Sequence, residues 1–250
     1  MRLIDSVIAG LATGLVLASV AAAQPAYITA AVNDPTRTAK SRELDATRKP
    51  AQVLAFAGVK PGDKVCDLMP GAGYYTILFS DLVGPRGRVY AVAPQEILKF
   101  GPRATEGVIA LQTDHKNIVL TSPAINAFAV AEPLDAVWTS WNYHDFHDPF
   151  MGPADVAKVN KAIFDSLKPG GVFLVVDHKA EPGSGIRDTN TLHRIDIETV
   201  KSEVEAAGFV LDSASEALAN PEDTHNLNVF DGKIRGRTDT FVLKFRKPKV

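Results

Sequence analysis

The sequence is poor in cysteine, in net charge and in long apolar runs, and each shortage excludes a class of protein. Cys66 is the only cysteine of the 250 residues, so no disulfide can form within the chain and a disulfide-stapled scaffold is excluded. Because Cys66 lies in a strand-like apolar run, we expect a small buried side chain rather than a reactive thiol. The formal net charge is −2, without the basic stripe of a nucleic-acid-binding protein, so no nucleic-acid partner is predicted.

One apolar run stands apart from the rest of the chain. Met1-Arg2 gives a positive start, Ile8 to Val20 is apolar, and Ala21-Ala22-Ala23 supplies a cleavage site before Gln24. This three-part pattern predicts a secretory signal peptide over residues 1–23. The run is too short for a stable membrane anchor, and no cysteine follows it for lipid attachment. We therefore expect an exported, periplasmic protein, cleaved near Ala23-Gln24.

The remaining length suits one α/β domain. Residues 24–47 are polar and are interpreted as a lead-in segment, and residues 48–250 form the domain. Strand-like and helix-like segments alternate there, and uninterrupted apolar strands are typical of a mainly parallel sheet covered on both faces. The predicted strands are Lys64–Leu68, Arg88–Val92, Val108–Leu111, Leu134–Ser140, Val172–Asp177, Phe209–Leu211 and Phe241–Phe245. The polar stretch Ala219–Arg237 is too long for an ordinary connection and is predicted to be a lid-like loop or a small hairpin.

A glycine-containing turn follows the first predicted strand. The segment 65–76 reads VCDLMPGAGYYT, which places Asp67 at the end of the strand and Gly71 and Gly73 in the turn before a helix. Glycines let the backbone approach a ligand closely, and a helix N-terminus presents free N–H groups. In doubly wound sheets such crevices lie at the carboxyl ends of the strands. The pattern therefore predicts a ligand-binding crevice beside Asp67.

This segment resembles motif I of the class I S-adenosylmethionine-dependent methyltransferases. Residues 134–140 (LDAVWTS) resemble the fourth-strand motif of that family, and residues 167–177 (LKPGGVFLVVD) resemble the segment that leads into its fifth strand. Through RKP at 48–50, WNYHD at 141–145 and LHRID at 192–196, the chain is also similar to a group of predicted exported bacterial methyltransferases. The resemblance implies a doubly wound, mainly parallel, seven-stranded Rossmann-like sheet and S-adenosyl-L-methionine as the cofactor.

The resemblance also implies the cofactor contacts, and two positions depart from the family pattern. Met69 stands where the family usually has its first motif I glycine, and the second strand ends in Val92-Ala93-Pro94-Gln95, without the usual acid for the ribose hydroxyls. The predicted cofactor-binding residues are Asp67, Gly71, Gly73, Gln95 as a substitute for the missing acid, and Asp114 on the adenine side. Glu96 is the alternative to Gln95, and neither residue stands at the usual position of the acid.

Polar groups that follow the fourth and fifth strands are the candidate catalytic residues. Methyl transfer from a sulfonium needs alignment and desolvation, and a hydroxyl acceptor also benefits from a base with a pKa near neutrality. Imidazole suits this role, so we predict His144 as the base, followed by His178 and then His193. His144 and His147 also have a spacing suited to metal binding, but no third ligand is evident, so no metal site is predicted.

Three functions are consistent with these residues. The first is an exported methyltransferase of the EC 2.1.1 class, with a small molecule or an envelope component as acceptor. The second is a binding protein of the same fold with degraded cofactor contacts, which Met69 and the missing ribose acid motivate. The third is an NAD-type oxidoreductase. Its binding motif is Gly-x-Gly-x-x-Gly, and at the position of the third glycine this chain has Thr76. Substrate contacts in such folds come from variable loops, so the acceptor is left open, as is the oligomeric state.

Overall fold

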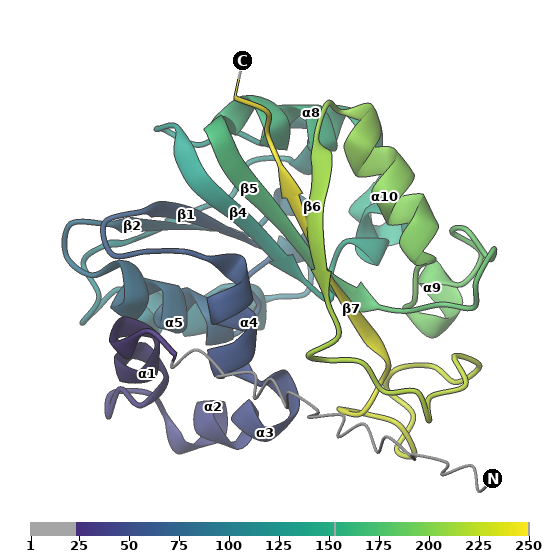
Figure 1. Ribbon diagram of the computed structural model, residues 1–250, viewed down its shortest axis with the longest axis horizontal. Coiled ribbons are helices and arrows are strands. Elements are labelled where there is room, and N and C mark those ends of the chain that lie inside the picture. The colour runs from purple at the N-terminus through teal and green to yellow at the C-terminus, as the bar shows by residue number, and fades with distance from the viewer. Residues whose placement is uncertain (1–23, 153, 250) are drawn as a thin grey trace, which may run out of the picture.

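The computed structural model describes residues 24–152 and 154–249 as a single α/β unit built on one sheet (Figure 1). The predicted signal peptide, residues 1–23, lies outside the described residues. Within the described ranges, no helix is both long enough and apolar enough to cross a bilayer. The seven strands are β1 (Lys64–Leu68), β2 (Arg88–Val92), β3 (Ile118–Thr121), β4 (Leu134–Ser140), β5 (Leu167–His178), β6 (Val210–Ser215) and β7 (Thr240–Arg246).

The strands lie in the order β3-β2-β1-β4-β5-β7-β6. β1 to β5 are parallel neighbours, whereas β7 runs antiparallel to both β5 and β6. The order reverses between β1 and β4, and ligands bind at such a switch point, outside the carboxyl ends of the strands. The predicted seven-stranded, mainly parallel sheet is therefore confirmed.

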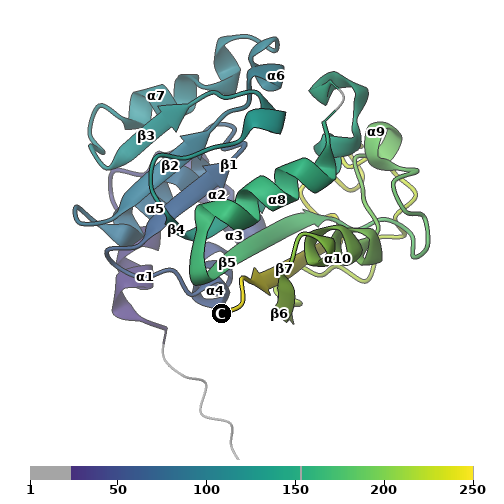
Figure 2. The ribbon, with the colours of Figure 1, turned by 90° about the horizontal axis from the view of Figure 1, so that it is seen from above.

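Helices cover both faces of the sheet (Figures 1 and 2). The α-helices are α1 (Ala26–Val32), α2 (Ala39–Glu43), α3 (Asp45–Arg48), α4 (Pro50–Ala57), α5 (Tyr74–Val83), α6 (Gln95–Leu98), α7 (Glu106–Leu111), α8 (Val156–Ser166), α9 (Thr189–Leu192) and α10 (Ile197–Ala206). Four short 3-10 helices are η1 (Pro102–Ala104), η2 (Ile125–Ala127), η3 (His144–His147) and η4 (Pro149–Met151). One core lies between the sheet and α1, α4 and α5, and the other lies between the sheet and α8 and α10.

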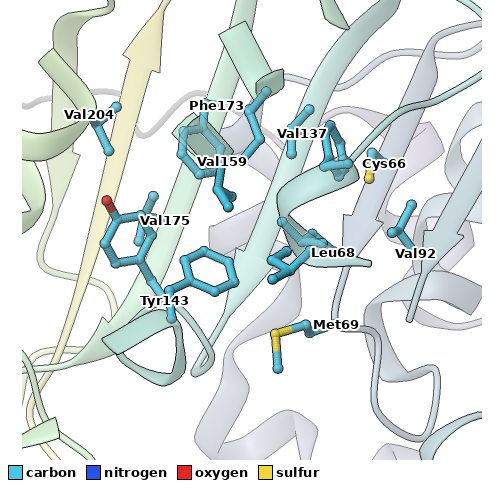
Figure 3. Close-up of a cluster of buried hydrophobic side chains, with 14 of the residues drawn as sticks. Cys66, Leu68, Met69, Val92, Val137, Tyr143, Val159, Phe173, Val175 and Val204 are labelled. Carbon is cyan, nitrogen blue, oxygen red and sulfur yellow. The ribbon is translucent and has the colours of Figure 1, made fainter. Parts of the chain in front are cut away.

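The buried cores follow from the alternation of side chains along the strands. Cys66 and Leu68 of β1 point into the core on the α8 side, where Figure 3 shows them near Val137 of β4 and Phe173 of β5. Val65, from the same strand, points into the opposite core. Cys66 is fully buried, and burial raises the pKa of its thiol well above the usual value, as expected for a packing residue.

The lead-in segment, residues 24–47, is largely helical: Ile28 of α1 is buried in the core beside α5, and Arg37 pairs with Asp45 at 2.6 Å. One segment differs from the prediction. The predicted strand Val108–Leu111 belongs to helix α7, and the third strand is Ile118–Thr121. A four-residue apolar run fits a buried helix turn as well as a strand, so its length could not decide between them.

Candidate functional site

Two adjacent strands at the switch point end in strained backbone. β1 continues into Met69 and β4 into Trp141, whose φ angles are +60° and +57°. Non-glycine residues rarely occupy this left-handed region, and holding one there costs about 1–3 kcal/mol. His193, which caps α9, has a φ of +55°. Such strain clusters at functional sites, and here it surrounds the carboxyl edge of the sheet.

Asp67 lies in β1, two residues before the strained Met69, and its side chain is 2 % exposed. The Thr76 hydroxyl, in the first turn of α5, donates a hydrogen bond to Asp67 Oδ2 at 2.6 Å. Burial raises the pKa of the Asp67 carboxyl to about 7, against the opposing effects of Thr76 and Arg48. A desolvated carboxyl with a perturbed pKa beside a crevice is a candidate functional group.

The two glycines of the β1–α5 turn are needed for different reasons. Gly71 has a φ of +55°, and a Cβ atom built there would meet no atom within 4 Å, so this side of the turn is open. Gly73 has a φ of +84°, and its Cβ atom would lie 2.8 Å from Leu111 Cδ1. Gly71 therefore borders the crevice, whereas position 73 favours glycine through its left-handed φ and its close approach to Leu111 of α7.

Arg48 is a candidate that sequence reasoning missed. Its guanidinium lies 4.4 Å from the ring centroid of Tyr74 and 4.8 Å from that of Trp141. Burial lowers the pKa of Arg48, but the group stays cationic, and Asp67 lies within its electrostatic reach. The only signal in the sequence was its place in the Arg48-Lys49-Pro50 segment, which carries no information on contacts with β4.

The turn after β2 offers less to a ligand. Gln95, the first residue of α6, is exposed at the expected edge of the sheet. Glu96, the carboxylate next to it, accepts a hydrogen bond from the Ile125 backbone N–H, which lies 3.1 Å from each of its oxygens. Glu96 therefore supports the β3–η2 connection, and Gln95 remains as the polar side chain of this turn.

The predicted adenine-side role of Asp114 is wrong. Asp114 follows α7 and precedes β3, so it lies at the amino end of the strand, beside Arg88 at the start of β2. The misassigned strand at Val108–Leu111 caused the error, because it placed the wrong end of a strand next to Asp114. The residue at the carboxyl end of β3 is instead Thr121. Its buried hydroxyl has no hydrogen-bond partner within the described part of the chain.

Two hollows flank the end of β4. The first, of about 260 Å³, is bordered by Met69, Gly71, Asn142 and Asp145 and has an apolar wall that includes Phe150. Asn142 ties its two sides together, since its Nδ2 donates to Met69 O at 3.0 Å and to Ser140 O at 2.6 Å.

The second hollow, of about 340 Å³, lies on the other side of Trp141. It is bordered by Arg48, Trp141, His178, Phe230 and Arg235. Both hollows therefore reach the edge of the sheet where the strained residues and the histidines lie.

The three predicted histidines come together. The ring centroid of His144 lies 6.2 Å from that of His178 and 5.5 Å from that of His193. His144 Nδ1 lies 2.8 Å from Asp177 Oδ1, and its Nε2 lies 3.2 Å from Asp145 Oδ1. Burial disfavours a charged ring, but these two carboxylates outweigh it and raise the pKa of His144 to about 10.

His178 is in the opposite state. Burial lowers its pKa to about 3, an effect that the charge on His144 reinforces and that Asp177 only partly offsets. Its Nδ1 lies 2.8 Å from the Thr238 hydroxyl. The site therefore places a protonated and a neutral imidazole side by side, and the order of the three histidines as base remains a prediction.

His147 does not join this group. Its Nε2 lies 3.3 Å from Glu203 Oε2 on α10, so the His144-x-x-His147 spacing does not produce a shared ligand site. The stretch Ala219–Arg237 contains no helix or strand and is a loop rather than a hairpin. It is anchored by the buried pair of Arg194 and Asp223, and the ring of its Phe230 lies 5.0 Å from that of His193. The loop thus covers the histidine cluster.

The geometry resembles that of known methyltransferases, and the sequence agrees. Residues 24–181, more than half of the chain, match the profile of the family described as protein-L-isoaspartate(D-aspartate) O-methyltransferase (PCMT). The chain belongs to this methyltransferase family. Its resemblance to the class I S-adenosylmethionine-dependent methyltransferases is therefore confirmed, and S-adenosylmethionine is the cofactor of that class.

Individual relatives agree with this assignment. The protein-L-isoaspartate O-methyltransferase of Ignicoccus hospitalis is 28 % identical over 141 residues, which cover 56 % of this chain and 58 % of the relative. The ubiquinone/menaquinone biosynthesis C-methyltransferase UbiE of Yersinia enterocolitica is 32 % identical over 144 residues, which cover 55 % of this chain and 52 % of the relative. The chain thus matches over about half the length of these relatives.

Solved structures show the same fold. An S-adenosylmethionine-dependent methyltransferase from Aquifex aeolicus superposes with a TM-score of 0.56 at 22 % identity, over 83 % of this chain and 97 % of the other. The [4+2]-cyclase SpnF superposes with a TM-score of 0.60 at 14 % identity, over 87 % and 85 % of the two chains.

The residues at the carboxyl edge fit S-adenosylmethionine at its methionine end. Arg48 makes no salt bridge with any described carboxylate and is available to the cofactor carboxylate. Asp67 would supply a carboxylate for the ammonium group, and the open side of Gly71 would leave room for the chain between the two charged groups. At the ribose end, Gln95 is the polar side chain that remains, because Glu96 is held by Ile125.

Proposed function

We propose that this protein is an exported S-adenosylmethionine-dependent methyltransferase that methylates a nucleophilic oxygen of a small molecule or an envelope component. The observation that carries the proposal is the position of Asp145, which contacts His144 of the histidine cluster and borders the same hollow as Gly71. S-adenosylmethionine supplies a methyl group on a sulfonium: the acceptor oxygen forms the new C–O bond, the S–C bond breaks, and its electron pair stays on sulfur.

The residues of the chain then have separate tasks. Asp67 and Arg48 hold the two charged groups at the methionine end of the cofactor, while Met69 and Phe150 keep water from the apolar wall of the first hollow. Asp145 borders that hollow and lies 3.2 Å from His144 Nε2, so it is the polar group that an acceptor hydroxyl would meet first. The proton released by the acceptor passes to the Asp145 carboxylate, which the protonated His144 holds in place through its Nε2.

Export is supported by the sequence of residues 1–23, with its positive start, apolar run and alanine-rich cleavage site. An exported methyltransferase must bind its cofactor before export or receive it outside the cytoplasm. Fractionation of cells that express the full chain tests this part: we expect a periplasmic protein that begins at Gln24, and a cytoplasmic protein with an intact N-terminus would contradict it.

Calorimetric titration with S-adenosylmethionine and S-adenosylhomocysteine tests the cofactor site. We expect micromolar binding of both compounds to the chain from Gln24 onward. Absence of binding at millimolar ligand would overturn the proposal and favour a binding protein of the same fold, which Met69 and the missing ribose acid would then explain.

The catalytic side is tested by His144→Ala. This variant should lose methyl transfer while retaining its affinity for S-adenosylmethionine, because His144 is 3 % exposed behind Asp145 and contacts neither hollow. Methyl transfer to water-soluble acceptors, including an isoaspartyl peptide, is followed as production of S-adenosylhomocysteine. Turnover equal to that of the unmodified protein would remove His144 from the mechanism.

A further inference from the structure

Next to the proposed acceptor position, three side chains with metal-ligating atoms face one another. His144 and Asp145 belong to η3, which follows β4, and His193 caps α9, which follows β5. One ligand atom from each residue lies within 4.8 Å of the ligand atoms of the other two. Because β4 and β5 are neighbours, two segments about fifty residues apart bring two imidazoles and a carboxylate to one point.

The ring of His144 is held in the orientation that a metal ligand needs. Asp177, which is fully buried, lies 2.8 Å from His144 Nδ1 and accepts hydrogen bonds from the backbone N–H groups of His144 and His178. A carboxylate fixed in this way keeps a proton on Nδ1 and directs Nε2 toward Asp145 and His193. A metal ion bound there takes the place of the proton that Nε2 otherwise carries, and this proton is released to water. Metal-ligating histidines are oriented in this way by a carboxylate behind the ring.

A further carboxylate, Asp148, adds negative charge beside the cluster. Asp148 is 2 % exposed, and neither of its carboxylate oxygens receives a well-formed hydrogen bond from a described residue, although Thr189 lies beside it. Asp148 is within electrostatic reach of Asp145, His144 and His193. A buried carboxylate without a donor is unfavourable unless a positive charge lies nearby.

We propose that His144, Asp145 and His193 bind one divalent transition-metal ion of the Zn²⁺ type. Imidazole nitrogens with a carboxylate oxygen are ligands that such ions prefer over Mg²⁺ or Ca²⁺. Three protein ligands leave a further coordination position open, as in catalytic zinc sites. Asp145 also borders the first hollow, so the open position lies on the acceptor side.

Metal binding at this site does not depend on the proposed function, but a catalytic role of the metal rests on it. If the proposed function holds, an acceptor oxygen bound at the open position would be held beside the cofactor and would release its proton more readily. The experiment therefore measures metal binding without cofactor or acceptor, so that the two proposals can fail separately.

Protein purified without a histidine tag and freed of metal with a chelator is titrated with Zn²⁺ by calorimetry. We expect one ion per chain, and visible absorption bands of a low-symmetry site when Co²⁺ replaces Zn²⁺. Asp145→Asn and His193→Gln should each weaken binding by more than the 10- to 100-fold that an outer-shell change costs, and Asp177→Asn should fall within that roughly 10- to 100-fold range.

His147→Gln is the matched control, because it lies in the same turn as His144 but faces Glu203. It should bind Zn²⁺ as tightly as the unmodified protein. Circular dichroism establishes that each variant is folded. Because two ligand residues are substituted separately, the test still stands if one of the two variants does not fold. The proposal is overturned if the folded protein binds no Zn²⁺, or if Asp145→Asn and His193→Gln bind as tightly as His147→Gln.

Discussion

The segments that lead from β1 and from β2 into the following helices lie beside each other at the carboxyl edge, and each carries an acidic side chain. In the first, Asp67 near the end of β1 is buried, accepts one hydrogen bond from Thr76 and has a pKa raised to about 7 by burial. In the second, Glu96 is only partly buried and accepts the Ile125 backbone N–H through its carboxylate. The Asp67 carboxyl is desolvated with one side-chain hydrogen bond, whereas the Glu96 carboxylate stabilises the fold.

This difference gives a physical criterion for separating ligand groups from structural groups in the same kind of turn. A structural carboxylate has its hydrogen bonds satisfied by the protein and contributes to stability. A ligand carboxylate remains incompletely satisfied and lowers stability until the ligand arrives. Substitution of each acid should therefore have opposite consequences for cofactor affinity and for the free energy of unfolding.

The largest effect is expected from Asp67→Ala. The substitution removes the carboxylate that we propose for the ammonium group of the cofactor, so calorimetric binding of S-adenosylmethionine should fall below detection. The fold should remain, because one side-chain hydrogen bond to Thr76 is lost at a cost of about 1–3 kcal/mol. An unchanged affinity in the folded variant would place the cofactor elsewhere.

The next effect is on pH dependence. The pKa of Asp67 is raised from 3.8 to about 7 in the folded protein, so between these values the native state binds more protons than the unfolded state. The free energy of unfolding contributed by this group therefore falls as the pH rises from about 4 to 7, and the deficit is complete above pH 7, on the order of 4 kcal/mol.

Asp67→Asn removes this titration while keeping an acceptor for Thr76. The variant should be more stable than the unmodified protein at pH 8 and should match it near pH 4. Urea unfolding at pH 4, 5.5, 7 and 8 measures the difference. Two stability curves that run parallel across this range would show that Asp67 is not desolvated as the structure indicates.

Glu96→Ala should behave in the opposite way. Loss of the carboxylate leaves the Ile125 N–H without its acceptor, which should lower the free energy of unfolding by about 1–3 kcal/mol. The affinity for S-adenosylmethionine should stay the same, since Glu96 is held away from the ligand by that bond. Gln95→Ala is the matched change at the adjacent position: it should leave stability unaltered and weaken binding. If Glu96→Ala instead weakened binding while sparing stability, the two turns would have exchanged roles.

The sequence predicted what depends on neighbouring residues and missed what depends on distant ones. Local sequence patterns predict the apolar strands and the β1–α5 turn. The convergence of the three histidines follows because they come after strands that are neighbours in the sheet. By contrast, Asp177 lies 33 residues from His144, its hydrogen-bond partner, and Arg48 lies over the ring of Trp141, which is 93 residues further along the chain. The error at Val108–Leu111 has a different origin, because four apolar residues fit the periodicity of a helix as well as that of a strand. The position of Asp114 was predicted from this strand and was wrong for the same reason.

The smallest effect is the difference in stability between two variants of Met69, the residue that departs from the family glycine. Its side chain is 7 % exposed and packs in the core shown in Figure 3, while its φ of +60° strains the backbone. Met69→Ala removes the packing and keeps the strain, so it should cost about 2 kcal/mol or more. Met69→Gly removes both, and relief of the left-handed strain offsets about 1 kcal/mol of the loss. The smaller residue should therefore be tolerated better in urea unfolding, and a glycine variant less stable than the alanine variant would show that backbone strain at this position is negligible.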